Sequence, residues 1–126
     1  MVLHNQLLVN GYSKRPITDV EQLKVWLHSL VLDIDMKIIL GPYAFYVEKE
    51  GNRGITGFVG IETSHIAVHV WDEQSPASVQ FDLYTCSSLP MGKVMNALKQ
   101  DWGLFDAKHM LLERETGFII KELTNI

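Results

Sequence analysis

The sequence predicts an α+β fold, a two-layer sandwich in which two helices pack on one face of an antiparallel sheet. Two amphipathic helical stretches are separated by short segments that are rich in β-branched and aromatic residues. These segments follow the order strand, helix, several strands, helix, strands, with short turns between the strands. The length of 126 residues suits one hydrophobic core, so we expect a single domain over residues 1–126.

The first helix is expected to begin at Thr18, because Thr18 and Glu21 have the spacing of a capping box. The second is expected to begin after Pro90 and to end near Gly103. In both helices the apolar residues recur every three or four positions, which predicts one stripe that covers a sheet face. The first stripe contains Val20, Leu23, Trp26, Leu27, Leu30 and Val31, and the second contains Met91, Val94, Met95 and Leu98.

Several segments have the composition of strands, and the clearest of them alternate between apolar and polar residues. The pair Gly41-Pro42 separates two of them, a glycine-rich stretch at 50–54 reverses the chain, and another reversal is expected near Gly117. This pattern predicts a half-buried antiparallel sheet. The expected strands are 6–9, 36–40, 44–47, 55–61, 65–71, 78–85, 109–112 and 118–123.

Charge and composition argue against two classes of partner. The net charge of -4, with scattered lysine and arginine residues, provides no general attraction for nucleic acid. The apolar runs are far shorter than the roughly 20 residues that span a bilayer. Cys86 is the single cysteine, so no disulfide can form within the chain, and the first residues lack the pattern of a secretory signal. We therefore expect a cytoplasmic protein that binds neither nucleic acid nor membrane.

The residues suited to chemistry lie in the predicted strands, and no GxGxxG, P-loop, HExxH or paired-cysteine motif accompanies them. They are Ser64, His65, His69 and Cys86. Considered by residue type alone, the histidines suit ordinary hydrogen bonds in a strand, and Cys86 suits an inert buried thiol. A zinc site would have an incomplete ligand set, and a Cys-His hydrolase would require contact between Cys86 and His69. We therefore expect no metal.

The order of these residues resembles the pyruvoyl-dependent S-adenosylmethionine decarboxylase proenzymes of prokaryotes. The resemblance rests on Ser64-His65, on His69 five residues after the serine, on the acidic Glu73, and on the Tyr-Thr-Cys sequence at 84–86. It extends to the chain length, to the lead-in at 55–57 and to the order of strands and helices.

Four local features depart from the usual pattern of that family. Thr63 stands immediately before the serine where glutamate is usual, and Asp72 stands where proline is common. Ser87 replaces the glycine that follows the cysteine, and the segment from Ser64 to Cys86 is about two residues longer than usual. These differences are compatible with a divergent branch that uses another substrate.

The resemblance implies self-cleavage between Thr63 and Ser64 into a β chain, 1–63, and an α chain, 64–126. Ser64 then becomes a pyruvoyl group, the only cofactor, which forms a Schiff base with the amine of an amino-acid-type substrate and accepts electrons as carbon dioxide leaves. In this scheme His69 transfers protons during processing, and Cys86 is the proton donor in turnover. Thr56 supports the oxyanion of the cleavage step, although it is equally compatible with a plain strand threonine.

The predicted activity is decarboxylation of S-adenosylmethionine for spermidine biosynthesis. Two alternatives remain open: decarboxylation of arginine or ornithine by the same chemistry, and an unprocessed paralogue that acts as a binding protein. An extended strand would place His69 on the order of 16 Å from Ser64. Either the chain bends at Ser64 or His69 acts on a second subunit, and the resemblance implies a homodimer of processed protomers.

Overall fold

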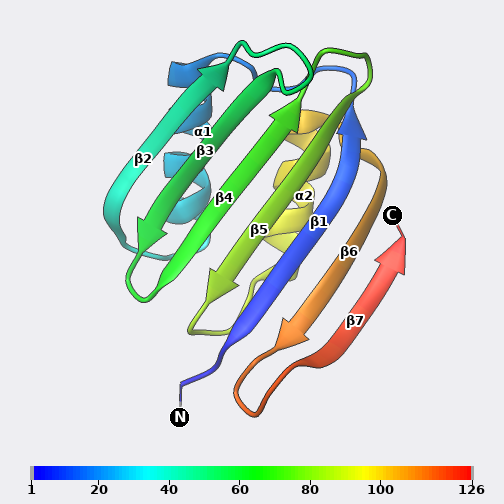
Figure 1. Cartoon of the computed structure of the whole chain (residues 1–126). Helices are drawn as coiled ribbons and strands as arrows, with labels where there is room; N and C mark the ends of the chain where they lie inside the picture. Colours follow the sequence, from blue (N-terminus) through cyan, green and yellow to red (C-terminus); the bar gives the residue numbers. More distant parts are fainter. Residues whose placement is uncertain (1, 126) are drawn as a thin grey trace.

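A seven-stranded antiparallel sheet forms one layer of the structure and two helices form the other (Figure 1), which confirms the predicted fold class. The computed structural model describes residues 2–125. Within these residues no helix is long and apolar enough to cross a membrane. The elements are β1 (Asn5–Ser13), α1 (Val20–Asp33), β2 (Ile38–Val47), β3 (Gly54–Ile61), β4 (Ser64–Trp71), β5 (Ala77–Thr85), α2 (Met91–Trp102), β6 (Phe105–Glu113) and β7 (Ile119–Asn125).

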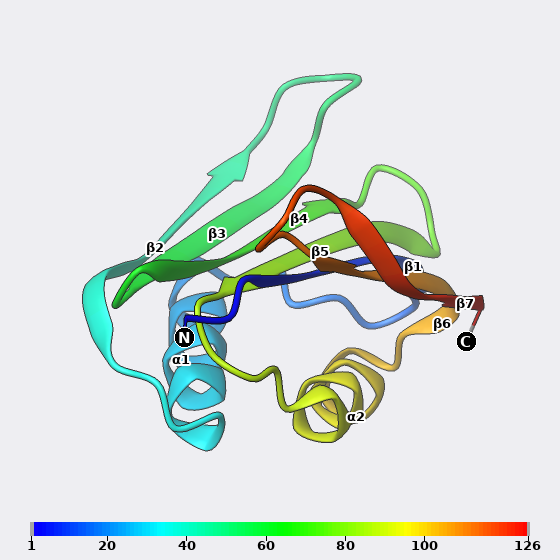
Figure 2. The same cartoon turned by 90° about the horizontal axis from the view of Figure 1, so that it is seen from below.

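The hydrophobic core lies between the helices and the sheet, and both helices lie on the same side of the sheet (Figure 2). The stripe predicted for α1 is buried from Leu23 to Val31, while the second stripe is buried at Val94 and Leu98. Alternate residues of the central strands complete the core, as the buried positions of β4 and β5 show. Among residues 2–125, no helix or strand covers the opposite face of the sheet, which we call the open face.

Two local predictions were wrong. Asp19, not Thr18, caps α1, because its carboxylate accepts a hydrogen bond of 3.0 Å from the backbone N–H of Gln22. The segments predicted as two strands around Gly41-Pro42 form one strand, β2, whose register with β3 shifts on both sides of Leu40. Pro42 is tolerated there because β2 is an edge strand, so a missing N–H costs no pairing on its outer side.

The strand order places an early segment of the chain between two late ones. The sheet runs β2-β3-β4-β5-β1-β6-β7, so the first strand pairs with β5 on one side and with β6 on the other. This central place explains why β1 is longer than the predicted 6–9. β3 and β4 form a hairpin with six register pairs, from Thr56 opposite His69 to Ile61 opposite Ser64.

Candidate active site at the β3–β4 turn

The turn between β3 and β4 consists of Glu62 and Thr63, and it precedes the predicted cleavage point directly. Thr63 has a φ of 52°, which lies in the left-handed region. A β-branched residue reaches this region only at a cost of about 1–3 kcal/mol, because its side chain crowds the backbone. The peptide bond between Thr63 and Ser64 therefore follows a strained residue.

The end of β5 brings Cys86 to this turn, because β5 runs antiparallel to β4 and its last residues lie opposite the start of β4. The backbone N–H of Cys86 donates a hydrogen bond of 3.1 Å to Ser64 Oγ, and Ser64 Oγ lies 3.7 Å from Cys86 Sγ. Thr63 Oγ1 lies 2.8 Å from the same sulfur. The two residues of the predicted scissile bond and the predicted proton donor are thus in direct contact.

The hydroxyl groups around Cys86 change the acidity of its thiol. Hydrogen bonds from Thr63 and then Ser64 lower the pKa of Cys86 from its ordinary value, while partial burial acts in the opposite direction. The lowered pKa raises the fraction of thiolate near neutral pH in the uncut chain. Cys86 is therefore suited to accept a proton before cleavage, a role that the sequence did not suggest.

His69 and Thr56 lie beside each other but away from Ser64. Thr56 Oγ1 is 3.0 Å from His69 Nδ1, across the β3–β4 pair. β4 is continuous from Ser64 to Trp71, so the chain does not bend between Ser64 and His69, and His69 lies on the order of 16 Å away along the strand. Ser64 shares the alternation of buried Ile66, whereas His69 lies on the open face. Within one protomer, Thr56 and His69 therefore lie far from the Ser64–Cys86 contact.

The geometry of the turn alone does not distinguish an enzyme from a binding protein, and a comparison with known families does. The family model described as S-adenosylmethionine decarboxylase matches residues 5–115. The chain belongs to the S-adenosylmethionine decarboxylase family. A search of curated proteins found no significant match. Membership supports an enzyme with a decarboxylase function, and the matched segment contains both the turn and Cys86.

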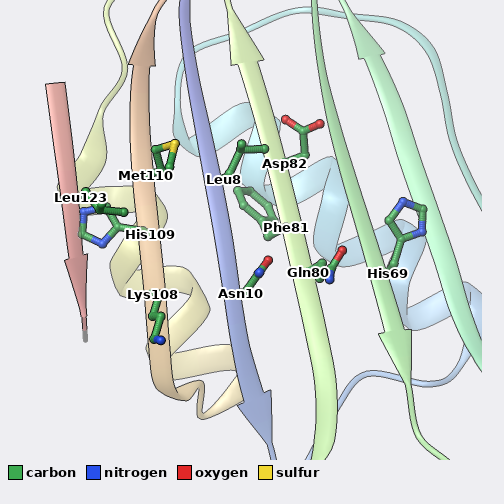
Figure 3. Close-up of a pocket in the computed structure, with 10 residues that line it drawn as sticks. All are labelled: Leu8, Asn10, His69, Gln80, Phe81, Asp82, Lys108, His109, Met110 and Leu123. Carbon is green, nitrogen blue, oxygen red and sulfur yellow. The ribbon is translucent and has the colours of Figure 1, made fainter. Parts of the chain in front are cut away.

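The open face of this S-adenosylmethionine decarboxylase family member carries a second group of polar residues, apart from the β3–β4 turn. A cavity of about 430 Å³ lies there, and His69 is part of its wall (Figure 3). Asp82 accepts a hydrogen bond of 2.8 Å from Gln6 and lies 3.6 Å from His65. The cavity is lined by Leu8, Asn10, His69, Gln80, Phe81, Asp82, Lys108, His109, Met110 and Leu123. Sequence reasoning missed most of these residues, although the polar positions of alternating strands are a signal for such a face.

A cluster around Tyr84 was also missed from the sequence. Its hydroxyl lies 2.7 Å from His4 Nδ1, and the guanidinium of Arg114 lies 5.1 Å from its ring centre. The ring of His65 stacks on Tyr84 at 5.8 Å between centroids. These contacts join the first residues of the chain to β5, the strand that directly precedes Cys86. Among residues 2–125 no three histidine, cysteine or acidic side chains gather closely enough to hold a metal ion.

Proposed function

We propose that the chain is a self-processing, pyruvoyl-dependent decarboxylase of S-adenosylmethionine, cut between Thr63 and Ser64. One observation carries the proposal. The Cys86 N–H donates a hydrogen bond to the Ser64 hydroxyl, and the residue before Ser64 has a strained backbone conformation. Family membership supports the decarboxylase class. We further propose a cytoplasmic enzyme of spermidine biosynthesis, a role that follows from the substrate.

Self-cleavage requires the Ser64 hydroxyl to replace its own amide nitrogen. Ser64 Oγ attacks the carbonyl carbon of Thr63, the C–N bond breaks, and an ester joins the two halves. Loss of the Ser64 α-proton then allows the Cβ–Oγ bond to break, which releases Thr63 as a carboxylate. Water replaces the nitrogen on the new terminus, and ammonia leaves. Strain at Thr63 favours the first step, because the turn relaxes when the bond breaks.

The site has the features that a pyruvoyl group formed from Ser64 would need. Such a group supplies an electron sink for the loss of carbon dioxide from an α-amino acid. Ser64 begins a strand, so its backbone is held by pairing with β3 and, further along β4, with β5. The thiol of Cys86 lies next to that position and supplies the proton that replaces the lost carboxylate.

The open face supports a homodimer of processed protomers. Several large aromatic side chains are exposed on this face, namely Tyr43, Phe45, Phe58 and Trp71. Sheets commonly pack face to face about 10 Å apart, and exposed apolar patches of this kind mark interfaces. In the proposed symmetric dimer, the His69 side chain of each protomer reaches the Ser64 site of the other at the end of the β3–β4 pair, so the contact occurs twice.

The proposal is tested by the intact mass of the purified protein and by a carbonyl-directed hydrazide label. We expect two fragments from a break before Ser64, with the label on the fragment that starts at residue 64. Carbon dioxide release is then measured on S-adenosylmethionine, arginine and ornithine, and we expect the first to be the best substrate. A single unlabelled species of 14.3 kDa after long incubation would favour a binding protein instead.

His69→Ala is expected to slow self-cleavage by about 10²-fold, because a positioned imidazole typically contributes at least this much to proton transfer. Co-expression with a size-tagged Ser64→Ala chain should restore cleavage of the His69→Ala chain. In such a mixed dimer, the intact imidazole of the uncut chain faces the intact serine of the other. Fragment yields are followed by mass, which separates the two chains.

Two controls accompany the mixing experiment. His69→Ala co-expressed with a tagged His69→Ala chain should remain slow, since neither protomer supplies an imidazole. Size-exclusion chromatography establishes that mixed dimers form. If mixed dimers form and the His69→Ala chain remains uncut, His69 does not act across an interface.

A further inference from the structure

The side chain of Thr63 contacts the thiol of Cys86. Thr63 Oγ1 lies 2.8 Å from Cys86 Sγ, and Ser64 Oγ lies 3.7 Å from that sulfur. The Cys86 N–H fixes Ser64 Oγ on the same side. We propose that Thr63 positions Cys86 so that the sulfur takes the hydroxyl proton of Ser64 when self-cleavage begins. This inference rests on the proposed function, because it assigns a role within its first step.

Contact distinguishes Cys86 from the other proton acceptor that the sequence suggested. The side chain of His69 projects from the open face of β4, on the order of 16 Å from Ser64, and can reach a serine only in another protomer. Cys86 touches Ser64 within one chain. The first proton transfer is therefore local, and His69 is left for a later step such as removal of the Ser64 α-proton.

The Thr63 hydroxyl suits both protonation states of the sulfur, because its single hydrogen has two acceptors within reach. They are the Glu62 carbonyl oxygen, at 2.7 Å, and Cys86 Sγ. When the sulfur is protonated, the thiol donates to Thr63 Oγ1 and the hydroxyl donates to Glu62. When the sulfur is ionised, the hydroxyl hydrogen turns toward it. This added hydrogen bond to the anion is the principal cause of the lowered pKa of Cys86.

The step balances without any further reactant. The Ser64 O–H bond breaks, an S–H bond forms on Cys86, and Oγ bonds to the carbonyl carbon of Thr63. As the C–N bond breaks, the departing nitrogen of Ser64 needs a proton, and the Cys86 thiol returns the one it took. The thiolate is regenerated, and no net proton is consumed.

Two substitutions at Thr63 separate its hydroxyl from its backbone strain. Thr63→Val removes the hydroxyl but keeps the β-branched shape, and with it the strain of a positive φ. Thr63→Ser keeps the hydroxyl and removes the branch. Cleavage of freshly refolded chains is followed by mass from pH 5 to 10. We expect the rate to rise with pH as Cys86 ionises and then to level off.

Thr63→Val should slow cleavage about tenfold below the midpoint and move the midpoint to higher pH. A hydrogen bond to an ionised group typically changes an equilibrium constant by about tenfold or more. Cys86 is partly exposed, so we expect an effect near the tenfold end of that range. Thr63→Ser should retain the midpoint of the wild-type chain. A purely structural role for Thr63 would change the rate at all pH values and leave the midpoint where it was.

A second measurement does not depend on cleavage. Cys86 is the single cysteine, so alkylation by iodoacetamide reports on one thiol. Alkylation rates against pH are compared in three uncut chains: Ser64→Ala alone, Ser64→Ala with Thr63→Val (the valine chain), and Ser64→Ala with Thr63→Ser (the serine chain). We expect the valine chain alone to have an alkylation midpoint at higher pH.

Each outcome bears on a different claim. Equal alkylation midpoints in the valine and serine chains would overturn the Thr63–Cys86 contact. Distinct alkylation midpoints with identical cleavage profiles would overturn the transfer of the serine proton to sulfur. An uncut wild-type chain would overturn the proposed function itself, and the alkylation series would still test the contact.

Discussion

Ser64→Ala is expected to give a single uncut chain of 126 residues with no decarboxylase activity. The substitution removes the hydroxyl oxygen that is proposed to attack the Thr63 carbonyl, and alanine has no oxygen to eliminate. Cleavage and carbonyl labelling should therefore both disappear. Intact mass, hydrazide labelling and carbon dioxide release check the three losses in one preparation.

Ser78→Ala is the matched control for this loss. Ser78 also lies in a central strand of the sheet and is also half-buried, but it is far from the turn, at the start of β5. That chain should be cut and labelled as the wild type is. A Ser64→Ala chain that still breaks before residue 64 would show that the serine is not the nucleophile.

Cys86→Ala is expected to lower the decarboxylation rate of the cut protein by about 10²- to 10⁴-fold, the range of positioned general acids. The sulfur lies 3.7 Å from Ser64 Oγ, and alanine leaves the substrate carbon to be protonated by solvent. Misplaced protonation would leave the substrate's amine on the protein and inactivate one site per error. Progress curves of the variant should therefore flatten early.

The Cys86 experiment needs a correction for cleavage, because the same thiol takes part in the first step by our inference. Rates are expressed per labelled carbonyl, so that uncut chains do not count. Cys86→Ser retains a weaker acid and should fall between the wild type and Cys86→Ala. Wild-type turnover per carbonyl in Cys86→Ala would show that the proton comes from another group.

Most of the fold was predictable because it depends on local periodicity. The stripe from Leu23 to Val31 and the alternation of β4 and β5 each identify a buried face without knowledge of the partner. The errors lie at the boundaries of helices and strands, where a single hydrogen bond can determine the residue at which an element begins or ends. Asp19 competes with Thr18 for the same cap, and pairing with β3 carries β2 past Pro42.

The candidate site was less predictable, because it depends on contacts between strands. The resemblance pointed to Ser64 and Cys86, but only the β4–β5 register explains why these residues touch. The left-handed conformation of Thr63 arises in a two-residue turn that has no glycine to signal it. The contact between Thr63 and the thiol follows from that conformation, and no local pattern encodes it.

The position of β1 between β5 and β6 determines what cleavage does to the whole molecule. A break before Ser64 gives one fragment with β1, α1, β2 and β3 and another with β4, β5, α2, β6 and β7. Neither fragment then has a complete sheet, and the two interlock through the pairs of β1 and of β3 with β4. Unfolding of the cut protein would then separate two fragments of each protomer as well as the two protomers. The melting temperature of the cut protein should therefore rise more steeply with concentration than that of the uncut Ser64→Ala chain.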